Sequence, residues 1–155
     1  MIGNFSRSIR GTSVSGLLML GLAACSAGAQ AASYTMYRDP QCGCCEKWAA
    51  HIRSDMKAKV SVVDTADMTS LKDRKGVPQQ LRSCHSMVVD SYVIEGHVPA
   101  RDIARLLREK PAGVRGLAVP GMPLGSPGME VGGRIQHYAV IAFGPGGTKL
   151  FASYP

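Results

Sequence analysis

Beyond its first 31 residues, the 155-residue sequence has no apolar run approaching the roughly 18 residues that a membrane-spanning helix needs. Within those 31 residues, Arg7 and Arg10 precede an apolar stretch at residues 14–24, which is too short for a membrane span, and small residues follow it. This three-part layout is typical of a secretory signal. We therefore predict a cleaved signal peptide at 1–31, one mature domain at 32–155 and no membrane span.

Two processing routes compete at the end of this signal. Residues 29–31 read Ala-Gln-Ala and fit the small-x-small pattern of a signal peptidase site. Residues 22–25 read Leu-Ala-Ala-Cys and resemble a bacterial lipoprotein box, in which Cys25 would carry a lipid anchor. On either route Cys25 is not a free thiol of the mature protein.

The sequence is also poor in acidic and aromatic residues. Lys and Arg number 18 against 11 Asp and Glu, and aromatic residues make up 6 % of the chain. Two of the arginines fall in the signal, so the formal charge of +7 becomes +5 for the mature domain. The basic residues are scattered and do not alternate with aromatic ones, which is untypical of a nucleic-acid-binding surface. We interpret them as solvated and expect no nucleic-acid partner.

Hydrophobic periodicity predicts an α/β fold. Residues 34–38 and 60–64 are rich in strand formers, and Trp48, Ile52 and Met56 recur at helical spacing within 45–57. Further along, the pattern predicts a short helix or loop at 68–76, a hairpin at 87–97, a helix at 99–110 that stops before Pro111, and a closing hairpin of 138–143 with 149–154. Residues 116–133 are so rich in Gly and Pro that we expect no regular element there. This order predicts one sheet with helices packed on it.

The main chemical feature is "DPQCGCCEKW" at residues 39–48, which holds three cysteines at a predicted strand-to-helix junction. Cys42 and Cys45 have Cys-x-x-Cys spacing, and the first turn of a helix favours a thiolate. This arrangement would suit disulfide exchange, with Cys42 as the attacking and Cys45 as the resolving thiol. Cys44 adds a third thiol that could scramble their disulfide, so it is useless for simple exchange.

Three neighbouring thiolates would repel one another unless a cation neutralises them. Soft thiolates select Cu(I), zinc or iron–sulfur centres. A structural zinc site usually has two separated ligand pairs, and an iron–sulfur protein exported in folded form would be expected to carry a twin-arginine signal, which Arg7 and Arg10 do not form. Copper remains, and because Cu(I) accepts bridging thiolates, more than one ion is compatible with the cluster.

The fourth mature cysteine, Cys84, lies in "RSCHSM" beside His85. In a thioredoxin-like layout this segment faces the helix terminus, which would bring Cys84 to the other three thiols. The alternative is a disulfide from Cys84 to one of them. His85 is a candidate ligand or hydrogen-bond donor to a ligand, whereas we interpret the other histidines, at positions 51, 97 and 137, as structural or solvated.

Two methionines, Met122 and Met129, lie within the predicted Gly- and Pro-rich loop. Methionine usually fills gaps in a core, but flanking Gly and Pro residues leave no helix or strand face to bury these two. They are additional candidate ligands, and we expect their loop to border the cysteine cluster as a lid.

Four motifs in order, "YRDPQCGCCEKW", "GVPQQLRSCHS", "YVIEGHVPARDIARLL" and "GLAVPGMPLGSPGME", resemble the thioredoxin-like domain-of-unknown-function family that includes CopG-type periplasmic copper-resistance proteins. The resemblance runs from about Tyr34 to the end of the chain. It implies a thioredoxin-like fold, a mixed central sheet flanked by helices, in a periplasmic copper-binding protein. It also implies copper ligands at Cys42, Cys44, Cys45 and Cys84.

Three functions therefore compete. The first is periplasmic Cu(I) binding in copper resistance or homeostasis, with other periplasmic copper-handling proteins as partners. The second is a thiol–disulfide or copper oxidoreductase that uses Cys42 and Cys45. The third is a structural module whose four cysteines form two disulfides. Cys44 favours the first over the second, because a third thiol is useless for simple exchange and valuable for metal binding. No residue is assigned a catalytic role on the first interpretation.

Overall fold

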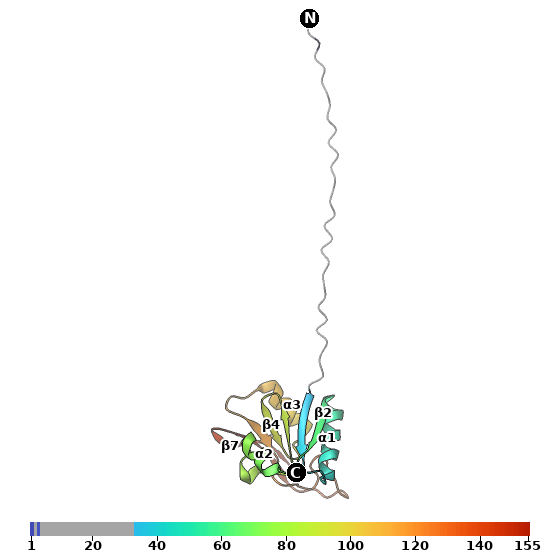
Figure 1. The fold of residues 1–155 in the computed structure, drawn as a ribbon, viewed down its shortest axis with the longest axis vertical. Helices are drawn as coiled ribbons and strands as arrows, with labels where there is room; N and C mark the ends of the chain where they lie inside the picture. Colours follow the sequence, from blue (N-terminus) through green and yellow to red (C-terminus); the bar gives the residue numbers. More distant parts are fainter. Residues whose placement is uncertain (2, 4–32) are drawn as a thin grey trace.

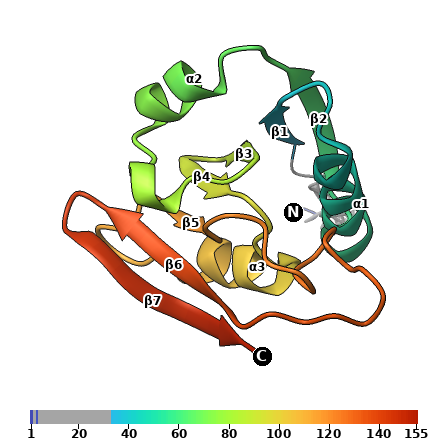
Figure 2. The ribbon, with the colours of Figure 1, turned by 90° about the horizontal axis from the view of Figure 1, so that it is seen from below.

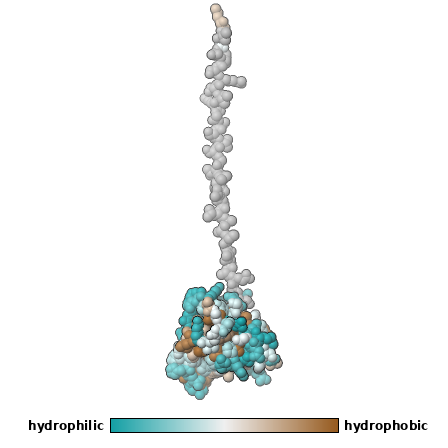
Figure 3. Space-filling view, turned by 90° about the vertical axis from the view of Figure 1, so that its left-hand side faces the viewer, coloured by the Kyte–Doolittle hydropathy of each residue, from teal (hydrophilic) through white to brown (hydrophobic). Residues whose placement is uncertain are grey.

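The computed structural model describes residues 1, 3 and 33–155 (Figure 1). The predicted signal peptide, with its two processing routes and Cys25, lies outside these residues apart from positions 1 and 3, and it stays a prediction. Within the described part of the chain, no helix is long and apolar enough to cross a membrane. On the face seen in Figure 3, hydrophilic residues surround smaller hydrophobic patches.

Residues 33–155 form one mixed sheet of seven strands in the order β2-β1-β3-β4-β5-β6-β7. The strands are β1 (Ser33–Arg38), β2 (Lys59–Asp64), β3 (His85–Val89), β4 (Tyr92–Glu95), β5 (Gly116–Ala118), β6 (Tyr138–Gly144) and β7 (Gly147–Tyr154). The β1–β2 and β4–β5 pairs are parallel and the other neighbours are antiparallel. The predicted α/β class and mixed thioredoxin-like sheet are therefore confirmed.

Helices cover both faces of this sheet (Figure 2). They are α1 (Gly43–Met56), α2 (Met68–Lys75) and α3 (Ala100–Glu109), with a short 3-10 turn η1 (Gln79–Leu81) after α2. Helices α1 and α3 lie on one face and α2 on the other. The segment at 68–76, predicted as helix or loop, is helical because the Asp67 side chain accepts from Ser70 N and Gly76 ends the helix in the left-handed conformation.

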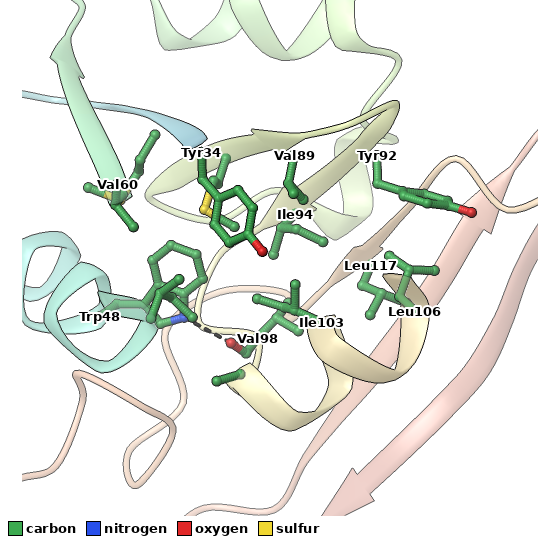
Figure 4. Close-up of a cluster of buried hydrophobic side chains, with 14 of the residues drawn as sticks. Tyr34, Trp48, Val60, Val89, Tyr92, Ile94, Val98, Ile103, Leu106 and Leu117 are labelled. Atoms are coloured by element: carbon green, nitrogen blue, oxygen red, sulfur yellow. Dashed lines mark hydrogen bonds between the residues drawn. The ribbon is translucent and has the colours of Figure 1, made fainter. Parts of the chain in front are cut away.

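The main core lies between the sheet and helices α1 and α3 (Figure 4). The α1 residues Trp48 and Ile52 are fully buried, as predicted from their spacing, and the indole nitrogen of Trp48 donates a hydrogen bond of 2.9 Å to the Val98 carbonyl. A smaller second core on the α2 side contains Val77, Leu81, Val93, Ala118 and Phe143. Each fully buried aliphatic or aromatic side chain contributes about 1.5–3 kcal/mol relative to exposure, so α1 is held firmly against the sheet.

The expectation that residues 116–133 form no regular element is wrong at their beginning, because β5 occupies 116–118. This short strand gains hydrogen bonds from β4 on one side and β6 on the other. A side chain at Gly116 would collide with the Val93 carbonyl, so glycine permits the close approach of the two strands. Beyond β5, the remaining residues through Gly133 form turns, bends and one isolated bridge, Val131 to Arg134.

Candidate metal centre

The three clustered cysteines lie where β1 ends and α1 begins, as the sequence predicts. Helix α1 starts at Gly43, two residues earlier than expected, so Cys42 is its N-cap and Cys44 and Cys45 belong to its first turn. The connecting turn is closed by a hydrogen bond of 3.0 Å from Cys42 N to the Asp39 carbonyl. Arg38 Nη1 donates to the Cys42 carbonyl at 3.0 Å, which fixes the cluster to the end of β1.

Cys84 directly precedes β3 and lies beside these three cysteines. Strands β1 and β3 are antiparallel, with Arg38 opposite His85, so the beginning of β3 meets the end of β1. The sulfur atoms of Cys42, Cys44, Cys45 and Cys84 all lie within 4.8 Å of one another. The predicted proximity of Cys84 to the cluster is therefore confirmed, although about 40 residues of chain separate them.

Two of the four cysteines are joined. Cys42 and Cys45 form a disulfide, with their Cα atoms 5.5 Å apart. Cys44 and Cys84 are free and half-buried, and the Cys44 sulfur lies 3.5 Å from that of Cys42. Residues 33–155 therefore adopt neither the module with two disulfides nor the alternative disulfide from Cys84. The Cys-x-x-Cys pair is in its oxidised form.

His85 lies fully buried against the cluster. Its ring centroid is 4.4 Å from that of Trp48, and its Nδ1 lies 3.3 Å from the Cys84 sulfur. Its Nε2 is buried and has no hydrogen-bond partner among the described residues. Buried polar atoms are nearly always paired, so this nitrogen is open to a partner that the described residues do not supply.

His97 joins the same site, although the sequence interpretation set it aside. Its Nε2 lies 3.1 Å from the Cys84 sulfur, and its Nδ1 lies 2.8 Å from the Pro127 carbonyl. A carbonyl can only accept, so Nδ1 carries the proton and the lone pair on Nε2 faces Cys84. Cys84, His85 and His97 offer one ligand atom each within 4.8 Å, which makes Cys84 common to two groups of candidate ligands.

Burial controls the protonation of these groups. It raises the pKa of the Cys84 thiol to about 12, and the nearby Cys44 adds to the increase. Burial also lowers the pKa of His97, and it lowers that of His85 well below its usual 6.5, assisted by repulsion between the protonated forms of His85 and His97 and by the positive charge of Lys72. Both imidazoles are therefore neutral, the form that binds metals, and a bound cation would be needed to ionise Cys84 at neutral pH.

The loop after β5 borders the site, as predicted. Pro127 contacts His97, and the neighbouring Gly128, at φ +83°, approaches α1 so closely that a side chain there would lie 2.7 Å from Trp48 N and 2.9 Å from the Cys44 carbonyl. Glu130 accepts from Gly128 N and pairs with His51 on α1, each at 3.0 Å. These contacts hold the loop against the N-terminal half of α1, from Cys44 to His51.

The two methionines of this loop differ in exposure. The Met122 side chain is 51 % exposed, and Met129 is half-buried. Their assignment as additional ligands stays a prediction. The soft sulfur and imidazole donors that the fold does bring together fit a soft metal ion.

Comparison with known proteins places this site in a family. The family model described as "Protein of unknown function, DUF411" matches residues 81–129, which include Cys84, His85 and His97. None of the curated proteins compared with the chain matches it. Two solved structures, described as forms 2 and 1 of copper resistance protein CopG, each match with 42 % identity and a TM-score of 0.76. The matches cover 81 % of this chain and 100 % and 99 % of those chains. The chain therefore belongs to the DUF411 family and is a homologue of the copper resistance protein CopG.

Proposed function

We propose that this protein binds Cu(I) in the periplasm through Cys42, Cys44, Cys45 and Cys84, with His85 and His97 as further ligands, and so contributes to copper resistance or homeostasis. The observation that carries the proposal is the convergence of four sulfurs and two neutral imidazoles on one end of the sheet. Homology to a protein described as a copper resistance protein supports copper as the ion.

The donor set supports a bound cation, and Cu(I) in particular. Thiolates and imidazoles are donors that copper prefers, and sulfur selects its reduced state. A cation also removes the repulsion between neighbouring thiolates and the penalty for ionising the buried Cys84. Because Cys84 belongs to both ligand groups, its thiolate can bridge two ions, and we therefore propose that the site holds more than one Cu(I).

Reduction would complete the ligand set. The Cys42–Cys45 disulfide removes two thiolates, leaving Cys44 and Cys84 with the histidines. Anaerobic titration with Cu(I) against a competing chelator should therefore give a higher copper capacity for the reduced mature protein than for the oxidised one. Equal capacity in both states would contradict the role of Cys42 and Cys45 as ligands, and no binding in either state would refute the proposed function.

Location and partners form part of the same proposal. A signal peptide at 1–31 would deliver the domain to the periplasm, where bound copper would be exchanged with other copper-handling proteins. No nucleic-acid partner is proposed. Met122 and Met129 are proposed as additional ligands at the border of the site, and their replacement by Leu, singly and together, would test this through the measured Cu(I) affinity.

A copper or thiol–disulfide oxidoreductase is the second candidate, and the disulfide favours it. In the copper reaction, the reduced Cys42–Cys45 pair would give one electron to each of two Cu(II) ions. The products are a disulfide, two Cu(I) ions and two protons. Anaerobic addition of Cu(II) to the reduced protein should then consume two thiols for every two Cu(I) ions that a Cu(I)-specific chelator detects. A Cys42→Ser/Cys45→Ser variant should lose this reaction, and if it keeps the full rate, this candidate is wrong.

A further inference from the structure

A buried ion pair lies on the opposite face of the sheet from His85. Lys72 of α2 and Glu95 of β4 pair through Nζ and Oε1, and their side chains are only 5 % and 0 % exposed. Lys72 also donates to the hydroxyl of Ser86 at 3.2 Å. The small second core, which is apolar, packs against this same face through Val93 of β4. A charged pair in such a place needs an explanation.

The Glu95 carboxylate accepts hydrogen bonds at both ends of the segment that carries Cys84 and His85. Its Oε1 accepts from Ser83 N at 2.7 Å, and its Oε2 accepts from the Ser86 hydroxyl at 2.5 Å. Ser83 directly precedes Cys84, and Ser86 directly follows His85. One carboxylate therefore fixes the backbone before the two candidate ligands and a side chain after them.

Stability alone is a weak explanation for this pair. Removing two charges from water costs several kcal/mol per ion, and replacing a buried ion pair with well-packed apolar residues is often neutral or stabilising. We propose that the Lys72–Glu95 pair is a positioning element that holds Cys84 and His85 at the metal centre. The inference rests on the proposed copper-binding function, which it deepens by naming residues behind the ligands.

Paired substitutions test this role without leaving a buried charge unpaired. In Lys72→Met/Glu95→Leu, the hydrogen bonds from residue 95 to Ser83 N and the Ser86 hydroxyl are lost. In Lys72→Met/Glu95→Gln, the side-chain amide can still accept from Ser83 N and donate to the Ser86 hydroxyl. Phe143→Leu is the matched control, because it disturbs the same second core at a residue that takes no part in the hydrogen bonds of Glu95. Ser86→Ala removes the hydrogen bond between the Ser86 hydroxyl and Glu95 and keeps the Lys72–Glu95 ion pair.

Two measurements separate positioning from stability. The first is the Cu(I) dissociation constant of the reduced protein. The second needs no copper: phenylarsine oxide binds two thiols only when they are adjacent, so in the oxidised protein it reports whether Cys84 still lies beside Cys44. Circular dichroism and thermal unfolding establish that each variant folds.

We expect Lys72→Met/Glu95→Leu to weaken Cu(I) binding by about 10- to 100-fold, the usual cost of losing a partner of a metal ligand. It should also weaken phenylarsine oxide binding, and the Gln variant should restore both. Ser86→Ala should give a smaller loss of the same kind, which also decides the matter if the Leu variant does not fold.

The inference is overturned if the folded Leu variant, or Ser86→Ala in its place, loses no more affinity for either probe than Phe143→Leu. If the wild-type protein binds no Cu(I) but the Leu variant still loses phenylarsine oxide binding relative to Phe143→Leu, the proposed function fails and the positioning role stands.

Discussion

The sulfur of Cys84 lies 3.1 Å from Nε2 of His97, although 13 positions separate the two residues along the chain. They stand at the open end of the β3–β4 hairpin, where Gly96 N donates to the His85 carbonyl at 2.9 Å. The hairpin therefore places a thiol and an imidazole side by side, and the β1–α1 junction places three more sulfurs next to the Cys84 thiol.

Replacing His97 with Gln should weaken Cu(I) binding by at least the ~10-fold that loss of a partner of a metal ligand costs. Gln keeps a donor that can reach the Pro127 carbonyl, so the loop contact is largely preserved. A chelator competition assay measures the change. His137→Gln is the control, since His137 is exposed and lies outside the cluster. Equal Cu(I) affinities for the two variants would show that His97 is not a ligand.

Cys44→Ser should impair copper binding while leaving the fold intact. Cys44 is half-buried in the first turn of α1 and takes no part in the disulfide. Because it is a proposed ligand itself, we expect a loss at or above the top of the ~10- to 100-fold range seen for partners of ligands. Copper analysis and thermal unfolding provide the measurement, with exposed Lys47→Ala as the control. Unchanged stoichiometry and affinity would defeat the four-cysteine site.

Gly128→Ala should both destabilise the protein and weaken copper binding. The new methyl group would press on Trp48 N and the Cys44 carbonyl, and it would also be strained at φ +83°. Gly132→Ala is a matched control, because Gly132 also has a positive φ, +56°, but has open space around it. Left-handed strain costs about 1–3 kcal/mol in either variant. Urea unfolding should show a greater loss in the free energy of unfolding for Gly128→Ala than for Gly132→Ala. Similar losses would mean that the close approach of Gly128 to α1 does not contribute to stability.

Alkaline pH should destabilise the C-terminal hairpin through Tyr138. Burial, together with the nearby Tyr154, raises the pKa of Tyr138 from 10.0 to about 12. As pH rises above 10, the unfolded chain loses a proton that the folded protein retains, so the free energy of unfolding falls until pH approaches 12. Tyr138→Phe should make this decline shallower in urea titrations at successive pH values. Tyr37→Phe, outside the stacked pair, is the control, and an equal slope in both variants would contradict the assignment.

Export should produce a soluble protein that begins at Ala32. The small-x-small pattern at 29–31 supports cleavage there. Mass spectrometry of the protein from a periplasmic extract would give the mature N-terminus. A lipid-modified Cys25 that remains in the membrane fraction, and that disappears in Cys25→Ala, would establish the alternative route.

The local part of the site could be predicted because its signals are local. Cys42, Cys44 and Cys45 are adjacent in the chain, and the helical spacing that follows them places the cluster at a strand-to-helix junction. Cys84 could be placed with them only through the thioredoxin-like layout. Once that layout is assumed, the antiparallel pairing of β1 with β3 leaves little freedom for the residue that precedes β3.

His97 and β5 could not be predicted, since both depend on partners distant in the chain. An isolated histidine two residues beyond a strand carries no signal by itself, and only the register that pairs Ser86 with Glu95 brings it opposite Cys84. Residues 116–118 form a strand because β4 and β6 supply hydrogen bonds on both sides, which overrides their low intrinsic preference.

The packing of Trp48 against His85 gives the protein an optical reporter of its own. Trp48 is the sole tryptophan in the chain, so all indole emission originates 4.4 Å from a ring that belongs to the candidate site. Copper binding at His85 should change that fluorescence, so no attached dye is needed. Occupancy could then be followed in real time in the unmodified protein, and the same signal would reveal how fast an acceptor withdraws the ion.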